Sequence, residues 1–328
     1  MEPQQTCPVL ADRLRGAVWG LLVGDALGVP YEFHEPDVLP WSDRIEMDPP
    51  AWFDRAHQGT PSGTWSDDGA HALCLLASLL ERGCFDPDDL ARKLLAWFEA
   101  GYMAVDGRVF DCGIQTSRAL AALRAGQPPL SAGPRGEYDN GNGSLMRVLP
   151  LALWHEGPDA DLVDLAHRQS QITHGHARSQ VCCALYCLWA RRIVNGEPTA
   201  WGSAVTALRG HYGDSVLRGE LEDHVRPDDP SDGQGTGYVV DTLRTVRSVM
   251  EEPSFERVVR EAIGHGRDTD TTASVAGGLA GARHGIGGIP ERWLTALRGR
   301  DLAEPLVERL VVRAERAAGV SRGDRSGR

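Results

Sequence analysis

This chain of 328 residues lacks several features that mark specialised classes of protein. Residues 1–5 have neither the charged segment nor the apolar run of a signal peptide, so we expect a cytoplasmic protein. The longest apolar stretch, residues 18–29, is interrupted by Gly20, Gly24 and Asp25. It is too short and too polar to span a membrane, so we expect no membrane partner.

Cysteine provides no disulfide scaffold. The seven cysteines have no regular spacing, and their odd number favours a reducing compartment. Cys183 and Cys187 lie one helical turn apart, which allows a soft-metal site. No further Cys or His pair lies near them in sequence, and we therefore interpret both as packing residues of a buried helix.

Positive charge is also scarce. The formal net charge is −12, and no Lys/Arg-rich block occurs before the last few residues. We therefore expect no stable nucleic-acid partner, although one local pocket could still bind an anion. With 41% hydrophobic residues the chain can bury a substantial core, and we expect a monomer.

The alternating pattern of β-strands is nearly absent, and helix patterns dominate. Residues 10–27 carry Gly16, Gly20 and Gly24 at a four-residue spacing that lets another helix approach closely. Further helices are expected from Ser66 to near Gly83, from Asp86 to Gly101, and at 112–125, 144–156, 159–169, 176–194, 199–210, 238–251, 254–264, 269–284 and 301–318.

Two segments interrupt the helices. Residues 133–144 form a turn-rich loop, and the polar residues 213–237 are predicted to form a mobile surface loop. No linker or repeat divides the rest, so we predict an all-α fold with one large helical domain over residues 1–318. The basic residues 319–328 are predicted to be a disordered tail.

Two acidic clusters lie about 200 residues apart, each at the start of a predicted helix: Thr64-Trp65-Ser66-Asp67-Asp68 and Gly266-Arg267-Asp268-Thr269-Asp270-Thr271. Each alone is ambiguous, because acids in a first helical turn usually only complement the helix dipole. Together they offer carboxylate and hydroxyl oxygens, the ligands that Mg²⁺ and Mn²⁺ prefer.

The second cluster is followed by residues 272–282, which are rich in Ala and Gly and allow very tight helix packing at the centre of a domain. Carboxylates buried there need a metal or a cationic partner. Only Arg267 is close in sequence. The two clusters therefore predict a site for one or two divalent cations and hydrolysis of a polar, phosphorylated substrate.

Three further elements are candidates for the same site. Residues 140–144, Asn140-Gly141-Asn142-Gly143-Ser144, can present backbone N–H groups to phosphate oxygens or hydrogen-bond to ribose, although a plain turn explains the same pattern. His174 precedes a predicted helix, where capping is the commoner role of histidine. Glu32 follows a helix end and can reach a pocket.

In this order the motifs resemble the ADP-ribosylglycohydrolase family, which includes the hydrolase that removes ADP-ribose from dinitrogenase reductase. The resemblance extends from Leu10 to Trp293. Its motifs are Gly24-Asp25-Ala26-Leu27-Gly28 through Glu32, Ser66-Asp67-Asp68, Gly141-Asn142-Gly143 through Met146-Arg147, Thr173-His174, Gly237-Tyr238-Val239 with Asp241-Thr242-Leu243, and Gly266 through Thr271.

The resemblance implies an all-α orthogonal bundle with two Mg²⁺ or Mn²⁺ ions. The implied metal ligands are Ser66, Asp67, Asp68, Asp268, Asp270 and Thr271. Family members usually have Thr where Ser66 stands, and Thr-x-Met after the acidic pair, where this chain has Gly69, Ala70 and His71. The missing side chain at Gly69 affects the surroundings of one metal, and His71 would add a polar contact instead.

The resemblance also implies a function: hydrolysis of the glycosidic bond between ADP-ribose and a protein side chain or small molecule. Asp68 or Asp268 would activate water, and Glu32 would gate the site or protonate the leaving group. The implied substrate-binding residues are Asn140, Gly141, Asn142, Gly143, Ser144, His174 and Tyr238. An inactive crystallin-like member of the fold and a metal-dependent nucleotide phosphohydrolase remain the alternatives, and the acceptor stays open.

Overall fold

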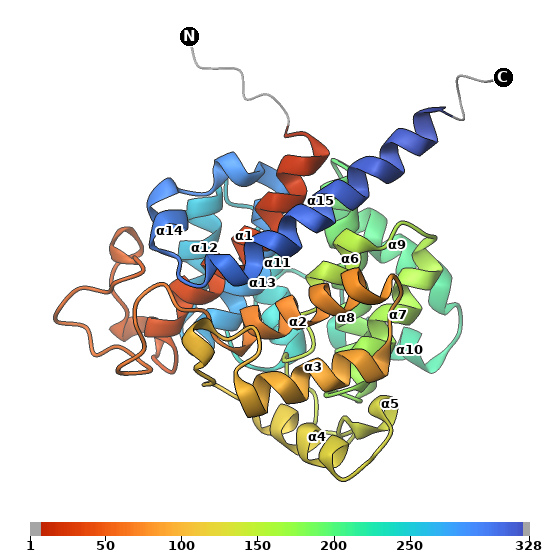
Figure 1. Cartoon of the computed structure of the whole chain (residues 1–328), viewed down its shortest axis with the longest axis horizontal. Helices are drawn as coiled ribbons and strands as arrows, with labels where there is room; N and C mark the ends of the chain where they lie inside the picture. Colours follow the sequence, from red (N-terminus) through yellow and green to blue (C-terminus); the bar gives the residue numbers. More distant parts are fainter. Residues whose placement is uncertain (1–7, 324–328) are drawn as a thin grey trace.

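The computed structural model describes residues 8–323, and its regular structure is helical (Figure 1). The α-helices are α1 (Leu10–Gly28), α2 (Asp67–Arg82), α3 (Pro87–Ala100), α4 (Ile114–Arg124), α5 (Pro129–Ala132), α6 (Leu149–Trp154), α7 (Asp159–Gln171), α8 (Ala177–Val194), α9 (Ala200–Tyr212), α10 (Val216–Gly219), α11 (Val239–Val249), α12 (Phe255–Gly264), α13 (Thr269–His284), α14 (Glu291–Ala296) and α15 (Arg300–Gly323). Within this range the only β-pairing is one isolated bridge, Gly141 with Tyr238. The prediction of an all-α fold is confirmed.

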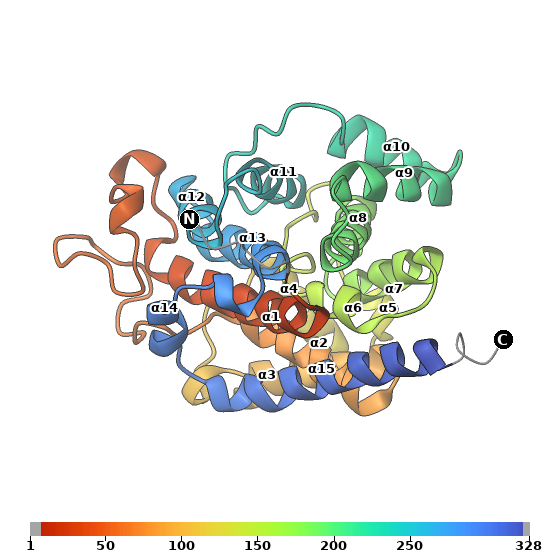
Figure 2. The same cartoon turned by 90° about the horizontal axis from the view of Figure 1, so that it is seen from above.

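Helices α1 and α13 lie side by side at the centre, with the other helices around them (Figures 1 and 2). Their backbones touch where both sequences carry glycine. A Cβ atom on Gly20 would lie 2.3 Å from the carbonyl oxygen of Gly277, and one on Gly16 would lie 2.2 Å from that of Gly281. The prediction that another helix approaches this one closely is confirmed, and the contact brings the start of α13 beside the end of α1.

The buried core surrounds this helix pair and includes α8, whose cysteines are fully buried. Cys182, Cys183 and Cys187 are free thiols with no exposed surface, in keeping with their interpretation as packing residues. No helix within residues 8–323 has the length and hydropathy needed to cross a membrane.

Most predicted helix ends lie within a few residues of the observed ones, with two clear differences. Helix α6 begins only at Leu149, because residues 142–147 form hydrogen-bonded turns, such as Leu145 N–H to the Asn142 carbonyl at 2.7 Å. Helix α15 continues to Gly323, past the predicted end at residue 318. Residues 324–328 of the predicted tail lie outside the described range, so disorder there stays a prediction.

The segment 213–237 is more structured than the predicted mobile loop. It contains α10 and one π-helical stretch, Glu220–Val225. Leu221 and Val225 of this stretch are buried against α8 and its neighbours. The composition of this segment is polar, but these two apolar side chains anchor it to the core.

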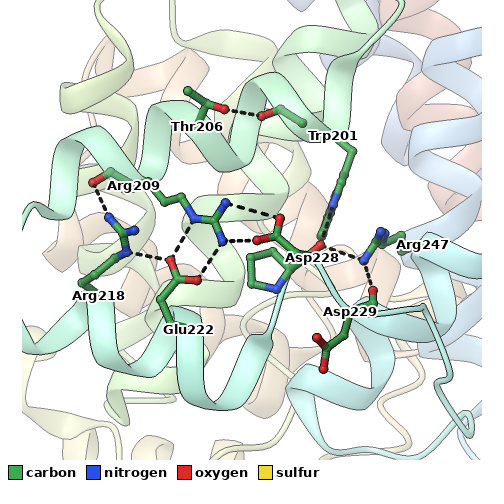
Figure 3. A network of polar contacts seen from close by, with 10 residues as sticks. Trp201, Thr206, Arg209, Arg218, Glu222, Asp228, Asp229 and Arg247 are labelled. Carbon is green, nitrogen blue, oxygen red and sulfur yellow. Dashed lines mark hydrogen bonds and ion pairs between the residues drawn. The ribbon is translucent and has the colours of Figure 1, made fainter.

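Ion pairs hold the same segment against α9 and α11 (Figure 3). Arg209 of α9 forms ion pairs with Glu222 at 2.7 Å and with Asp228 at 2.6 Å. Arg247 of α11 donates to the carbonyl oxygen of Asp229 at 2.7 Å. Two of the acids that suggested a solvated loop in the sequence, Glu222 and Asp228, are thus paired with an arginine of a neighbouring helix.

Candidate active site

The two acidic clusters meet in space at the N-terminal ends of α2 and α13. The tight contact between α1 and α13 places α13 beside α1, while α2 packs against both helices. Segments far apart in sequence therefore contribute carboxylates to one buried acid cluster. Its members are Asp25, Glu32, Asp67, Asp68, Asp111, Asp268 and Asp270.

Ser66 is the N-cap of α2, as its sequence predicted. Its hydroxyl accepts a hydrogen bond from the Asp68 N–H at 3.3 Å, which leaves Asp67 and Asp68 in the first turn. Asp25, at the end of α1, accepts hydrogen bonds from the Ser66 N–H at 2.9 Å and the Gly69 N–H at 2.7 Å. Asp25 thus fixes the start of α2 relative to α1.

Asp268 is the N-cap of α13 and faces the side chain of Asn142. The Asn142 amide donates to Asp268 Oδ2 at 2.8 Å and to the Thr242 hydroxyl at 2.9 Å. The Thr271 hydroxyl donates to Asp68 Oδ2 at 3.3 Å, so the two acidic clusters are directly hydrogen-bonded. The convergence expected of the two clusters is present.

Two members of the acid cluster were not singled out from the sequence. Asp111 lies in the loop before α4 and interacts electrostatically with Asp67, Asp268 and Asp270. A lone acid in a loop has no local pattern, but Asp111 directly precedes the helix predicted at 112–125, which is a weak signal. Asp25 belonged to a recognised motif, yet only the fold shows which backbone groups it binds.

Burial and mutual repulsion raise the pKa of every carboxyl in the acid cluster. The pKa of Asp111 rises to about 6, that of Asp25 to about 7 and that of Glu32 to about 11, each mainly because the group is buried and then because other acids lie near. The pKa values of Asp67, Asp68 and Asp270 are raised well above normal for the same reasons. Hydrogen bonds from Asn142 and Thr271 oppose the rise at Asp268.

The cluster has the properties expected of a cation site. Asp68 Oδ1 and Asp270 Oδ2 are buried and accept no hydrogen bond. Among residues 8–323, no Lys or Arg forms an ion pair with the acids at 67, 68, 268 and 270. Buried carboxylates without a cation are costly, and free carboxylate oxygens are hard ligands that divalent cations accept. The residues present therefore fit a divalent metal.

Ligand atoms approach one another closely at two places. Glu32, Asp268 and Asp270 form one group whose ligand atoms lie within 4.8 Å of one another, and Glu32, His57 and Asp111 form another. Glu32 is common to both. It lies where the acid cluster opens towards solvent, and its carboxyl shares a hydrogen bond with His57 Nε2.

Above the acid cluster is an open pocket of about 670 Å³. Its walls include Asp67, Asp68 and Asp268 of the acid cluster, the 140–143 turn and the first turn of α4. Phe33, Ile114 and Tyr138 are largely exposed at its edge. A pocket of this size accommodates a nucleotide-sized ligand.

The 140–143 turn lines this pocket, and a fully buried arginine stabilises it from the core side. Arg147 donates to the carbonyl oxygen of Gly143 at 3.0 Å and to the Thr173 hydroxyl at 2.7 Å. Ser144 was expected to bind substrate, but its hydroxyl is buried and bonds to Ser170 at 2.8 Å. Ser144 therefore lies in the core beneath the turn and not at the pocket surface, because the backbone turns inward after Gly143.

His174 and Tyr238 also line the pocket, as expected. His174 is buried, and this burial lowers its pKa to about 3, so the ring is neutral. Tyr238 is half-buried, and its hydroxyl accepts a hydrogen bond from Arg178 at 3.1 Å. Its backbone pairs with Gly141, which joins the two pocket walls.

The departures at Gly69 and His71 have different consequences. A Cβ at Gly69 would lie 2.8 Å from Leu22, 2.9 Å from Trp65 and 3.0 Å from the Asp25 carboxylate, so glycine suits this packing. His71 was expected to add a polar contact to the metal site. Instead both of its ring nitrogens are buried without a hydrogen bond, and the ring packs edge-on against Trp97 with centroids 4.2 Å apart.

Comparisons with known proteins agree with this geometry. A family model described as ADP-ribosylglycohydrolase matches residues 6–319. The chain is 32% identical to "ADP-ribosylarginine hydrolase Tri1" of Pseudomonas putida, over 92% of this chain and 79% of that protein. It is 30% identical to "ADP-ribosyl-[dinitrogen reductase] glycohydrolase" of Rhodospirillum rubrum, over 89% and 92%.

Two further matches cover nearly the whole chain. The human "ADP-ribosylhydrolase ARH3" is 28% identical, over 91% of this chain and 92% of that protein. A solved structure described as an "ADP-ribosylglycohydrolase-related protein complex" superimposes with a TM-score of 0.75 and 34% identity, over 93% of this chain and 98% of that chain.

Proposed function

Because the chain belongs to the ADP-ribosylglycohydrolase family, we propose that it hydrolyses the glycosidic bond between ADP-ribose and an acceptor and releases free ADP-ribose. The observation that supports this most strongly is the buried acid cluster, which has unpaired carboxylate oxygens and lies beneath a nucleotide-sized pocket. An arginine-linked ADP-ribose is the first substrate to test, since one relative is named an ADP-ribosylarginine hydrolase.

The ligands for two divalent cations, Mg²⁺ or Mn²⁺, would be Ser66, Asp67, Asp68, Asp268, Asp270 and Thr271. Such ions supply positive charge that offsets these carboxylates and attracts the hydroxyl oxygens of a ribose and a water molecule. The buried, unpaired oxygens of Asp68 and Asp270 support this assignment.

Either of two aspartates would take a proton from the attacking water. Asp268 lies at the N-cap of α13 and lines the pocket, where the Asn142 amide donates a hydrogen bond to its Oδ2. Asp68 also lines the pocket and has one oxygen without a hydrogen bond. A carboxylate within reach of the water is the general base that glycoside hydrolysis requires.

Glu32 is suited to the opposite task. Burial and the neighbouring acids keep its carboxyl protonated, so it can donate a proton to the departing acceptor atom. It lines the pocket beside Phe33, whose side chain is exposed at the pocket edge. Proton donation to the acceptor and removal of a proton from water then fall to different carboxyl groups.

Backbone N–H groups offset the negative charge of the substrate. Helix α4 begins at the pocket with no side-chain cap, and its first residues, Ile114 to Thr116, line the wall. Free N–H groups and the positive end of a helix dipole favour phosphate oxygens. Together with the 140–143 turn, this start of α4 would hold the diphosphate, and neutral His174 would contact the ribose.

The experiment incubates the protein with an ADP-ribosyl-arginine peptide, an ADP-ribosyl-serine peptide and O-acetyl-ADP-ribose, each with Mg²⁺, Mn²⁺ or EDTA. Mass spectrometry of the products should show metal-dependent release of intact ADP-ribose from at least one conjugate. Asp67→Ala and Asp268→Ala should abolish the release. Asp43→Asn, an exposed acid outside the cluster, is the matched control and should leave the rate unchanged.

The products also distinguish the two alternatives. AMP or inorganic phosphate in place of ADP-ribose would identify a phosphohydrolase. Metal binding with no turnover of any conjugate would identify an inactive, structural member of the fold. Normal turnover by either alanine variant would exclude the roles given to these aspartates.

A further inference from the structure

The segment from Glu32 to Gly63 contains only short helical turns and returns to the acid cluster at His57 (Figure 1). His57 Nε2 and Glu32 Oε2 share a hydrogen bond, the only one that the Glu32 carboxyl forms within residues 8–323. Asp68, Asp111 and Asp268 all lie near this carboxyl and destabilise its charged form. His57 therefore provides the one hydrogen bond that orients the buried Glu32 carboxyl within residues 8–323.

Several contacts fix the position of the His57 ring. Its centroid lies 5.4 Å from that of Phe33 and 5.1 Å from that of Phe110. Arg108 donates to the carbonyl oxygen of Gly59 at 2.5 Å. These contacts join the 33–63 segment to the loop that carries Asp111, on either side of the pocket entrance.

The backbone around this contact is strained. His57 has a φ of +48°, and Phe33, Asp111 and Arg267 also have positive φ although none of them is glycine. All four lie beside or within the acid cluster. Such conformations are unfavourable for residues other than glycine, and strain of this kind persists only where surrounding contacts enforce it. A flexible loop with no role in the site would relax.

We propose that His57 is a positioning residue that holds the Glu32 carboxyl above the acid cluster through the Nε2–Oε2 hydrogen bond. Phe33 and Phe110 fix the orientation of its ring. His57 touches neither the substrate nor the attacking water, and it acts on the reaction only through Glu32. This inference rests on the proposed function and adds a second residue to the proton-donating side of the site.

The test compares two variants that separate packing from hydrogen bonding. His57→Phe keeps an aromatic ring between Phe33 and Phe110 but removes the hydrogen bond. His57→Gln keeps an amide near the Nε2 position, which can donate to or accept from Glu32. With an ADP-ribosyl-arginine peptide and Mn²⁺, His57→Phe should lower kcat by about 10- to 100-fold with little change in KM, the size expected when a catalytic group is misplaced by ~1 Å.

His57→Gln should restore most of the lost kcat. In a Glu32→Gln background, His57→Phe should cause no further loss, since the two side chains act as a unit. Equal kcat in wild type and His57→Phe would overturn the inference. An equal loss of kcat in His57→Phe and His57→Gln, accompanied by a lower melting temperature, would also overturn it. That result would assign His57 a purely structural role.

A second readout does not depend on turnover. The amides of Ala56 and Thr60 are hydrogen-bonded to the carbonyl oxygens of Pro30 and His57, at 2.9 Å each. Hydrogen exchange at these amides should be faster in His57→Phe than in His57→Gln, because the segment loosens when Glu32 is released. An unchanged exchange rate in His57→Phe would refute the positioning role, and this result can be obtained even if no conjugate is cleaved. Failure of the wild type to release ADP-ribose would instead refute the proposed function and leave the positioning role standing.

Discussion

Replacing Glu32 by Gln tests the electrostatics of the acid cluster through the pH dependence of stability. In the metal-free protein, burial and then the charges of neighbouring acids raise the pKa of Glu32 to about 11 from an ordinary value of 4.5. Between pH 7 and 8.5 the folded protein therefore holds a proton that the unfolded chain has lost. Folding stability must fall as pH rises, by about 1.4 kcal/mol per pH unit for each such proton.

For Glu32 alone this amounts to a loss of about 2 kcal/mol between pH 7 and 8.5. Other raised acids of the cluster act in the same direction. Buried histidines act in the opposite direction: burial lowers the pKa of His174 to about 3 and that of His167 to about 4. Their effect is confined to pH values below about 6.5, where the unfolded imidazole gains its proton, so it does not obscure this window.

The assay is urea unfolding followed by circular dichroism at pH 7.0, 7.5, 8.0 and 8.5 in EDTA. The free energy of unfolding of the wild type should fall from pH 7.0 to 8.5, and that of Glu32→Gln should fall by about 2 kcal/mol less. Asp43→Asn, on the exposed surface, should behave as wild type. Saturating Mn²⁺ should flatten the wild-type dependence, because bound cations favour ionised carboxylates in the folded state. Identical slopes for wild type and Glu32→Gln in EDTA would refute the reasoning.

Four further substitutions test the packing and the site. Gly277→Ala places a Cβ 2.3 Å from the carbonyl oxygen of Gly20, and should destabilise the protein by about 1–3 kcal/mol in urea unfolding. Gly210→Ala, in an exposed turn of α9 where an added Cβ would meet nothing within 4 Å, should stabilise the protein by up to ~1 kcal/mol. A change of stability in the same direction for both glycine variants would contradict the close contact between Gly20 and Gly277. His71→Leu removes two unpartnered ring nitrogens and should raise stability by about 1–2 kcal/mol in the same assay, whereas a loss of stability would reveal a hidden partner. Asn142→Ala removes the 2.8 Å hydrogen bond to the N-cap carboxylate of α13 and should lower kcat/KM by about tenfold or more at unchanged melting temperature; unaltered kinetics would exclude its orienting role.

Much of the fold follows from periodic features of the sequence. Gly16, Gly20 and Gly24 predicted a close helix partner, and the Ala/Gly-rich residues 272–282 predicted a tightly packed central helix, but only the fold shows that these two helices pack on each other. The ends of long helices were predictable because caps and glycines mark them. The short helices α5, α10 and α14 were missed, since four to six residues carry too little periodicity to stand out.

The site was predictable where its residues are close in sequence. Ser66, Asp67 and Asp68 form one cluster, and both clusters lie at helix starts as expected. Asp111 was missed because a single acid in a loop has no pattern until the fold surrounds it with other acids. Ser144 was misplaced because the sequence of a turn does not show which side chain points inward.

Tertiary partners explain the remaining differences. Residues 213–237 looked like a mobile loop because their acids had no visible partners, and those partners include Arg209 of α9 for Glu222 and Arg244 of α11 for Asp232. His57 carried no signal either, since its contact with Glu32 joins two positions in an irregular segment. Contacts between segments without periodic structure are the part that the sequence alone leaves undetermined.

The most direct measurement is anomalous diffraction at the manganese edge from crystals grown with Mn²⁺ and ADP-ribose. The account predicts manganese peaks bounded by the carboxylates of Asp67, Asp68, Asp268 and Asp270, with the distal ribose hydroxyls of the ligand against them. Manganese found only elsewhere, or ADP-ribose bound away from these carboxylates, would contradict it.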